Sequence, residues 1–363
     1  MLTWKDYARM TEEERAKQDI GAVNLACAQG LPGAEQIDAP GCLAWLDLAK
    51  SNVEQATNRW FPQFHRNPQE FENSEARFRV RCLITVLQRD MGVKYNEAKI
   101  AADVPFDTAD SFIHGAIQGA GGTCVTLPVL YVAVGRRLDY PLKLVAAYGG
   151  PAANHLFARW DAPNGERFNI EATGHGLSCP PDDYYRTGRY AVTAEMERMG
   201  NYLVSKTPAM ELAGFLSERA LRFYDHGSLP ECVDAFAWAS ALEPTNVILR
   251  NTVKTKLNEW MRRMKNQRPA GFPEIRIKII ERRYPTTLPI ELECAIIGTE
   301  ASEAMLRDQA WQEKWWSKML RGEYPPTIPV AAHVDGKRDN GSISLQYEYP
   351  GGTPHFRLEA PNV

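Results

Sequence analysis

The sequence predicts an α+β protein, and three observations along the chain lead to that class. Residues 1 to about 100 carry apolar side chains mostly at helical spacing. A loop rich in glycine at 115–122 then leads into an apolar helix expected at 125–134. A strand at 141–148 and a hairpin at 155–171 come next. Helices followed by a small group of neighbouring strands are typical of the α+β class.

The first of these observations rests on two kinds of signal. Thr11 is followed three residues later by Glu14, which is the pattern of a capping box and predicts the start of a helix. Apolar residues recur close to helical spacing over 42–61 and again over 74–91. We expect this helical lead to support the rest of the molecule and to carry no chemistry itself.

Composition bounds the class of protein. The chain has 363 residues, of which 44% are hydrophobic and 24% charged, as in a folded soluble protein of more than one domain. Its formal charge of -3 gives no electrostatic reason to expect nucleic acid or an anionic membrane as a partner. No run approaches the roughly 20 apolar residues of a membrane span. The first residues lack the apolar core of a signal peptide, and the seven cysteines include no CxxC pair. We therefore expect a cytoplasmic protein with free thiols.

Changes along the chain predict three parts: 1–205 with the helical lead and the hairpin, 206–266 with further helices, and 267–363 as a small α+β unit. The Pro- and Gly-containing stretch 267–274 has the composition of a linker. The elements expected after it are strands at 275–280, 290–297, 330–334 and 343–349 and a helix at 301–320.

Cys124 lies where the glycine-rich loop enters the apolar helix. Unpaired N–H groups and the positive end of the helix dipole favour the thiolate there, which is the nucleophilic form. Gly121 and Gly122 would let a substrate backbone come close. The competing interpretation of a single cysteine is an inert buried thiol.

The hairpin supplies a base. With its turn centred on Pro163, His155 faces Glu171 and Phe157 faces Asn169. A carboxylate or amide beside His155 would fix its tautomer and stabilise the imidazolium, as the third member of a catalytic triad does. A plain structural contact between histidine and acid would leave the same pattern.

These residues also carry a family resemblance. The run from Gly122 through Cys124 to Pro141, the segment His155-Leu-Phe-Ala-Arg-Trp160 and the segment Asn169-Ile-Glu-Ala-Thr173 resemble three blocks of the transglutaminase-like superfamily of papain-like cysteine enzymes. The match runs over about 75–190. It implies a papain-like transglutaminase core with Cys124 as nucleophile, His155 as base and Glu171 as the orienting acid.

The chain departs from the family at two positions. Glu171 stands where the family usually has Asp, and Ala172 where it has Pro, so Asn169 is the alternative orienting residue. Gln118 precedes Cys124 by six residues, a spacing similar to that of the oxyanion-hole glutamine of papain-like enzymes. A solvated loop glutamine is the alternative for Gln118.

The helices at 213–246 resemble a single tetratricopeptide repeat, with Arg219-Ala220 where the repeat has Leu-Gly. One repeat makes no binding groove, so the alternative is a helical hairpin packed on the enzyme domain. The chain as a whole looks like the bacterial transglutaminase-like proteins with helices of this kind. A protein partner would bind through helices 206–266.

The predicted function is thiol-dependent hydrolysis of peptide or amide bonds in a peptide or protein substrate, through an acyl-enzyme on Cys124. Two alternatives stay open: a non-catalytic interaction module on the same fold, and an acyl transferase that accepts an amine and cross-links. No cofactor or metal is expected. His175 and Cys179 are four residues apart but no zinc knuckle accompanies them.

Overall fold

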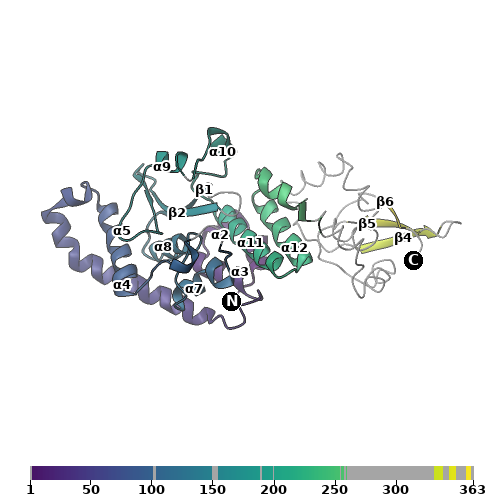
Figure 1. Cartoon of the computed structure of the whole chain (residues 1–363), viewed down its shortest axis with the longest axis horizontal. Coiled ribbons are helices and arrows are strands. Elements are labelled where there is room, and N and C mark those ends of the chain that lie inside the picture. The colour runs from purple at the N-terminus through teal and green to yellow at the C-terminus, as the bar shows by residue number, and fades with distance from the viewer. Residues whose placement is uncertain are drawn as a thin grey trace. The chain divides into compact units, whose positions relative to one another are not determined.

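The computed structural model describes residues 2–100, 104–148, 154–188, 190–198, 200–253, 255, 256 and 259, together with the backbone of strands at 331–337, 343–348 and 357–360. The chain divides into two compact units, Met1–Arg222 and Phe223–Val363. In the first unit, helices surround a small antiparallel sheet (Figure 1), so the predicted α+β class is confirmed.

Helices dominate the first unit, and α4 is the longest of those described. In chain order they are α1 (Trp4–Arg9), α2 (Glu12–Ala16), α3 (Ile20–Ala28), α4 (Ala39–Arg66), α5 (Glu75–Thr85), α6 (Thr108–Ser111), α7 (Ile113–Ile117), α8 (Leu127–Arg136), α9 (Asp182–Arg186), α10 (Ala194–Arg198) and α11 (Pro208–Asp225). Short 3-10 turns lie at Pro68–Phe71 and Glu97–Lys99, and a π-helical turn at Val86–Asp90.

The helical lead forms as the sequence predicts. Thr11 caps α2 through a capping box: its hydroxyl accepts a hydrogen bond from the Glu14 N–H at 3.2 Å, and the Glu14 carboxylate accepts one from the Thr11 N–H at 2.8 Å. Helix α4 contains the first predicted helical stretch, and α5 covers most of the second. The second stretch ends in the π-helical turn instead of a continuous α-helix.

Helix α8 is buried from Leu127 to Gly135, as its nearly uniform apolar sequence requires. It begins two residues later than predicted, because residues 124–126 form a hydrogen-bonded turn in front of it. The N–H of Leu127 donates to the carbonyl of Thr123 at 3.0 Å. Pro128 lies in the first turn of the helix, where a missing N–H removes no intrahelical bond. Helix α8 packs against β1 and β2.

The sheet of the first unit has the order β1 (Leu142–Tyr148), β2 (Asn154–Asp161), β3 (Arg167–Ile170), with antiparallel pairing throughout. The segment 201–206 adds a further bridge at the free edge of β1, where Ser205 pairs with Val145. The predicted strand and hairpin are therefore confirmed as elements.

The predicted register of the hairpin is wrong by two residues. Arg159, and not Phe157, lies opposite Asn169. The turn is centred on Asn164 instead of Pro163, because Gly165 takes a positive φ of 89° and the hairpin closes between Ala162 and Glu166. A shift of two residues keeps every side chain on its face of the sheet. His155 and Glu171 therefore remain on one face, in diagonal positions.

Helix α11 belongs to the first unit up to Arg222, beyond the boundary expected after residue 205. Two arginines connect α11 to other helices of the first unit. Arg136 at the end of α8 binds Glu211 of α11 with an N–O distance of 2.9 Å. Arg219 donates to the carbonyls of Cys27 and Gln29, both at 2.7 Å, at the end of α3. These bonds explain the arginine that stands where a tetratricopeptide repeat has leucine.

The second unit contains helix α12 (Leu229–Leu242) and an antiparallel sheet of β4 (Ala331–Lys337), β5 (Ile343–Glu348) and β6 (Arg357–Ala360). Strands β4 and β5 correspond to the strands expected at 330–334 and 343–349. The linker expected at 267–274, the strands at 275–280 and 290–297 and the helix at 301–320 lie outside the described residues.

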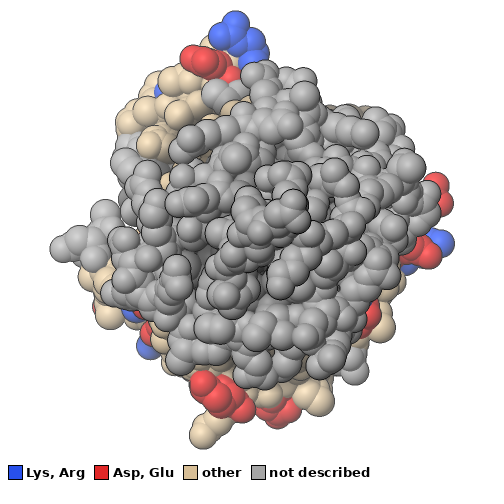
Figure 2. Space-filling view, turned by 90° about the vertical axis from the view of Figure 1, so that its right-hand side faces the viewer, with Lys and Arg blue, Asp and Glu red and all other residues tan. Residues whose placement is uncertain are grey.

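The described residues at the margin of Figure 2 carry both acidic and basic side chains, in keeping with the balance of 42 Lys and Arg against 45 Asp and Glu. Within the part of the chain that the structure describes, no helix is both long and apolar enough to cross a membrane.

Candidate active site

A buried histidine–carboxylate pair lies on one face of the β2–β3 hairpin. The Nε2 atom of His155, at the start of β2, is 2.8 Å from Oε2 of Glu171, which directly follows β3. Only 3% of the His155 surface and 8% of the Glu171 surface are exposed. The two residues lie in diagonal positions across the hairpin. The glutamate side chain, which is one methylene longer than that of aspartate, spans the distance between them.

Four donors surround the Glu171 carboxylate. Oε2 faces His155 and also accepts the Tyr185 hydroxyl at 3.0 Å. Oε1 accepts the hydroxyl and the N–H of Thr173, at 2.7 and 3.1 Å. Burial raises the pKa of Glu171, but the hydrogen bonds and charge from His155, with the Thr173 donors, outweigh it, and the net pKa is lowered. Glu171 is therefore ionised at neutral pH and has its lone pairs occupied.

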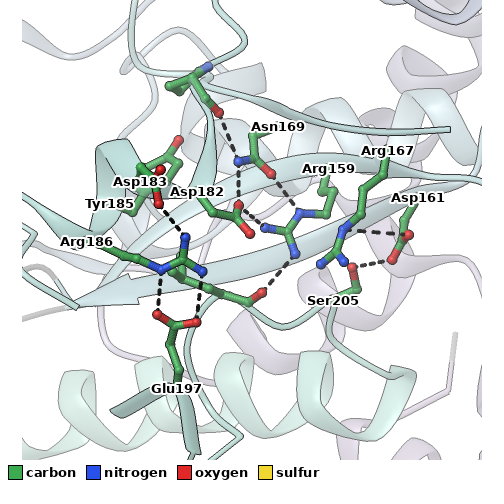
Figure 3. Close-up of polar contacts among 12 residues, drawn as sticks. Arg159, Asp161, Arg167, Asn169, Asp182, Asp183, Tyr185, Arg186, Glu197 and Ser205 are labelled. Atoms are coloured by element: carbon green, nitrogen blue, oxygen red, sulfur yellow. Dashed lines mark hydrogen bonds and ion pairs between the residues drawn. The ribbon is translucent and has the colours of Figure 1, made fainter. Parts of the chain in front are cut away.

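Asn169, the alternative orienting residue, binds elsewhere (Figure 3). Its carbonyl accepts from Nε of Arg159 at 2.7 Å. Its amide donates to Asp182 at 2.7 Å and to the carbonyl of Pro180 at 2.9 Å. The structure thus brings Glu171 to His155 and directs Asn169 to the arginine.

Cys124 lies in the turn that precedes α8 and is half-buried. Thr123 fixes this turn: its N–H donates to the Thr126 hydroxyl at 2.8 Å, and its own hydroxyl donates to the carbonyl of Asp110 at 2.7 Å. Because α8 packs against β2, the helix that begins after Cys124 is fastened to the strand that carries His155.

The two glycines before Cys124 serve the packing of the loop, which differs from the expected approach of a substrate backbone. Gly121 has a φ of 83°, and a Cβ there would lie 3.1 Å from the backbone of Asn96. A Cβ on Gly122 would lie 2.3 Å from the Leu127 side chain. Gly122 also pairs with the 94–96 segment, with Asn96 N–H donating to its carbonyl at 2.7 Å. The glycines thus hold the loop against its own neighbours.

The other described cysteines are poor nucleophiles. Burial raises the pKa of Cys27 and Cys232 to about 12 and that of Cys42 and Cys82 to about 11. Burial also raises the pKa of Cys179, which is half-buried. A thiol in these surroundings is protonated and slow to react at neutral pH.

His114 lies on α7, and Gln118 directly follows that helix. Gln118 ends the helix, with its N–H donating to the carbonyl of His114 at 2.7 Å, and its side chain is exposed. His114 is 3% exposed, and its Nδ1 atom has no hydrogen-bond partner. Burial lowers the pKa of His114 to about 4, against a smaller opposing effect of Asp107. His114 is therefore a neutral interior residue.

Acid should destabilise the protein through His114. Its folded pKa of about 4 lies below the roughly 6.5 of an unfolded histidine, so the unfolded state takes up a proton first as the pH falls. Stability is then lost between about pH 6.5 and 4, by about 2 kcal/mol at pH 5. We expect His114→Gln to lose about that much less stability than the wild type between pH 8 and pH 5, in urea unfolding.

The exposed His175 supplies the control for that experiment, since His175→Gln should follow the wild type at both pH values. Equal losses in the wild type and His114→Gln would contradict the assignment of His114.

Nothing in the sequence predicts the two tyrosines that contact the His155–Glu171 pair. Tyr185 donates to Glu171, and its ring stacks on Phe157 with centroids 4.1 Å apart. The Tyr190 hydroxyl is 3.3 Å from Nε2 of His155, and the two rings are 4.6 Å apart. Both tyrosines follow the hairpin in a stretch of short helices, where no periodicity predicts the direction of a side chain.

Among the described residues, no group of three or more His, Cys, Asp or Glu side chains is arranged to hold a metal ion. His175 and Cys179 thus have no third ligand of these types within that part of the chain.

Comparison with known proteins gives one match. Residues 48–210 match the family model of the transglutaminase-like superfamily, a segment that begins within α4, ends at the start of α11 and includes all five candidate site residues. No curated protein and no solved structure matches the chain.

Proposed function

We propose, from the premise that residues 48–210 form a transglutaminase-like domain of the papain-like type, that this domain is a cysteine hydrolase of peptide or amide bonds. Cys124 is the nucleophile, His155 the general base and acid, and Glu171 the orienting acid. The observation that carries the proposal is the buried pair of His155 and Glu171 at 2.8 Å.

The geometry of that pair supports a role for His155 in proton transfer. Glu171 occupies Nε2, so Nδ1 is the ring nitrogen that would take a proton from a thiol. A negative carboxylate on the far side stabilises the imidazolium that results. The low pKa of Glu171 keeps that charge in place at neutral pH.

The reaction proceeds in two halves. The Cys124 thiolate attacks the substrate carbonyl carbon, the C–S bond forms, and the C–N bond breaks as His155 donates its proton to the leaving amine. Water then gives a proton to His155 and attacks the thioester, and the C–S bond breaks to release the acid and the thiolate. The Cys124 N–H, at the positive end of α8, would stabilise the oxyanion in both halves, with the exposed Gln118 amide as the second donor.

The proposal is tested with p-nitrophenyl acetate as a generic acyl donor. We expect the wild-type chain to release nitrophenol and to acquire an acetyl group, and Cys124→Ser to do neither above the rate in buffer. Added methylamine should not accelerate deacylation if water is the natural acceptor. Acceleration would favour the amine transferase. Equal rates for wild type and Cys124→Ser would overturn the enzyme and leave the interaction module.

A further inference from the structure

The His155–Glu171 pair is covered by a segment that contributes no residue to the proposed triad. Helix α9 places Tyr185 over the hairpin, with no exposed surface, between Phe157 and the Glu171 carboxylate. The Tyr185 hydroxyl and His155 Nε2 share one oxygen of Glu171, Oε2. Tyr185 therefore fixes the direction from which the carboxylate meets the imidazole.

A buried arginine holds α9 in that position (Figure 3). Arg159 of β2 is completely buried, and its guanidinium reaches Asp182, the first residue of α9, with an N–O distance of 2.6 Å. The same guanidinium donates to Asn169 and to the carbonyl of Leu203, at 2.7 and 2.9 Å. All three partners come from different segments, so Arg159 joins β2, β3, α9 and the strand-like segment beside β1.

We propose that Tyr185 is a positioning residue of the active site, and that the Arg159–Asp182 ion pair holds α9 so that the Tyr185 hydroxyl reaches Glu171. This inference rests on the proposed function, because it concerns the same His155–Glu171 pair. Tyr185 acts on the reaction only through Glu171 and touches no reacting atom.

The groups around Glu171 explain why the Tyr185 hydroxyl acts only as a hydrogen-bond donor to this carboxylate. The titratable groups next to the carboxylate include His155 from β2, Tyr185 from α9 and Tyr131 from α8, while the Tyr190 hydroxyl contacts His155. Burial, followed by the charge and hydrogen bond of Glu171, raises the pKa of Tyr185. Burial raises that of Tyr131 to about 12, and its hydroxyl is bound by Gln88 at 2.9 Å. Tyr185 thus stays protonated and stabilises the ionised form of Glu171.

The test is the pH profile of Cys124 alkylation by iodoacetamide, read by peptide mapping in the full-length chain. Tyr185→Phe keeps the ring against Phe157 and removes only the hydroxyl. Loss of one hydrogen-bond donor raises the pKa of Glu171. The acid limb of the profile, which is the fall in the alkylation rate at low pH, should therefore shift to a higher pH by roughly one unit. Circular dichroism at each pH confirms that the variants remain folded.

Asp182→Asn should move the same limb in the same direction. In the double variant of Tyr185→Phe and Asp182→Asn, the shift should be smaller than the sum of the two single shifts. Both changes act on the same series of contacts, which runs from Arg159 to Glu171. The matched control is Arg186→Gln on the same helix. It removes ion pairs to Asp183 and Glu197 at an exposed surface and should leave the limb unchanged.

Two results are separable. If Cys124 is not the preferred site of alkylation in the wild type, the proposed function fails before Tyr185 is tested. If Cys124 is preferred but Tyr185→Phe has the wild-type limb, the function stands and the positioning role of Tyr185 is overturned. Additive shifts in the double variant would overturn the role of the Arg159–Asp182 pair alone.

Discussion

Replacing His155 by alanine is expected to lower the rate of Cys124 alkylation at pH 6 by about 10²-fold. A thiol without a cationic neighbour has a pKa of about 8.5, so well under 1% of it is thiolate at pH 6. A thiol paired with an imidazolium is largely thiolate at that pH. The measurement is the second-order rate constant with iodoacetamide, resolved by site through peptide mapping.

The exposed His175 again supplies the control, because His175→Ala removes a histidine close to the hairpin in sequence and should alkylate at the wild-type rate. A His155→Ala variant that reacts within a factor of two of the wild type would show that His155 does not activate the thiol. The histidine–glutamate pair would then be a structural contact.

Replacing Glu171 by glutamine is expected to lower the same rate at pH 6 by about 10-fold or more, a smaller loss than for His155→Ala. The variant keeps the shape of the side chain and removes the negative charge that favours the imidazolium. The folded state should persist, because the amide carbonyl can still accept from one of the two donor sets, either Thr173 or Tyr185.

Asn169→Ala distinguishes the two orienting residues that the sequence left open. Its amide binds Arg159, Asp182 and Pro180, so its loss should lower stability and leave the alkylation rate near the wild type. Arg159 still reaches Asp182 directly in that variant. If Asn169→Ala slows alkylation and Glu171→Gln does not, Asn169 is the orienting residue.

The hairpin illustrates how much could be predicted from the sequence. Alternation of side chains places His155 and Glu171 on one face in any register of the same parity, so their contact could be predicted. The register itself depends on which residues take the turn conformation. Because Gly165 takes a positive φ, the observed turn lies one residue from its predicted position, and the strand pairing differs from the predicted register by two residues. The contact forms although the predicted register is wrong, because the glutamate side chain is long enough to reach the diagonally placed histidine.

Other parts of the site could not be predicted, because they depend on contacts between distant segments. The packing of Asn96 and Leu127 against Gly121 and Gly122 has no local signature. The same holds for Tyr185, whose hydroxyl reaches Glu171 only because Arg159 binds Asp182, 23 positions further along the chain. Apolar periodicity predicts helices and strands, but it does not predict which short helix covers which strand.

The residue that receives an acyl group tests the nucleophilic role of Cys124 most directly. The full-length wild-type chain and His155→Ala are treated with p-nitrophenyl acetate, quenched in acid and mapped over all seven cysteines. The proposed role of Cys124 predicts an acetyl group on this residue in the wild type and its loss in His155→Ala. An acetyl group carried mainly by Cys179 or Cys294, or equal acetylation of Cys124 in both proteins, would contradict it.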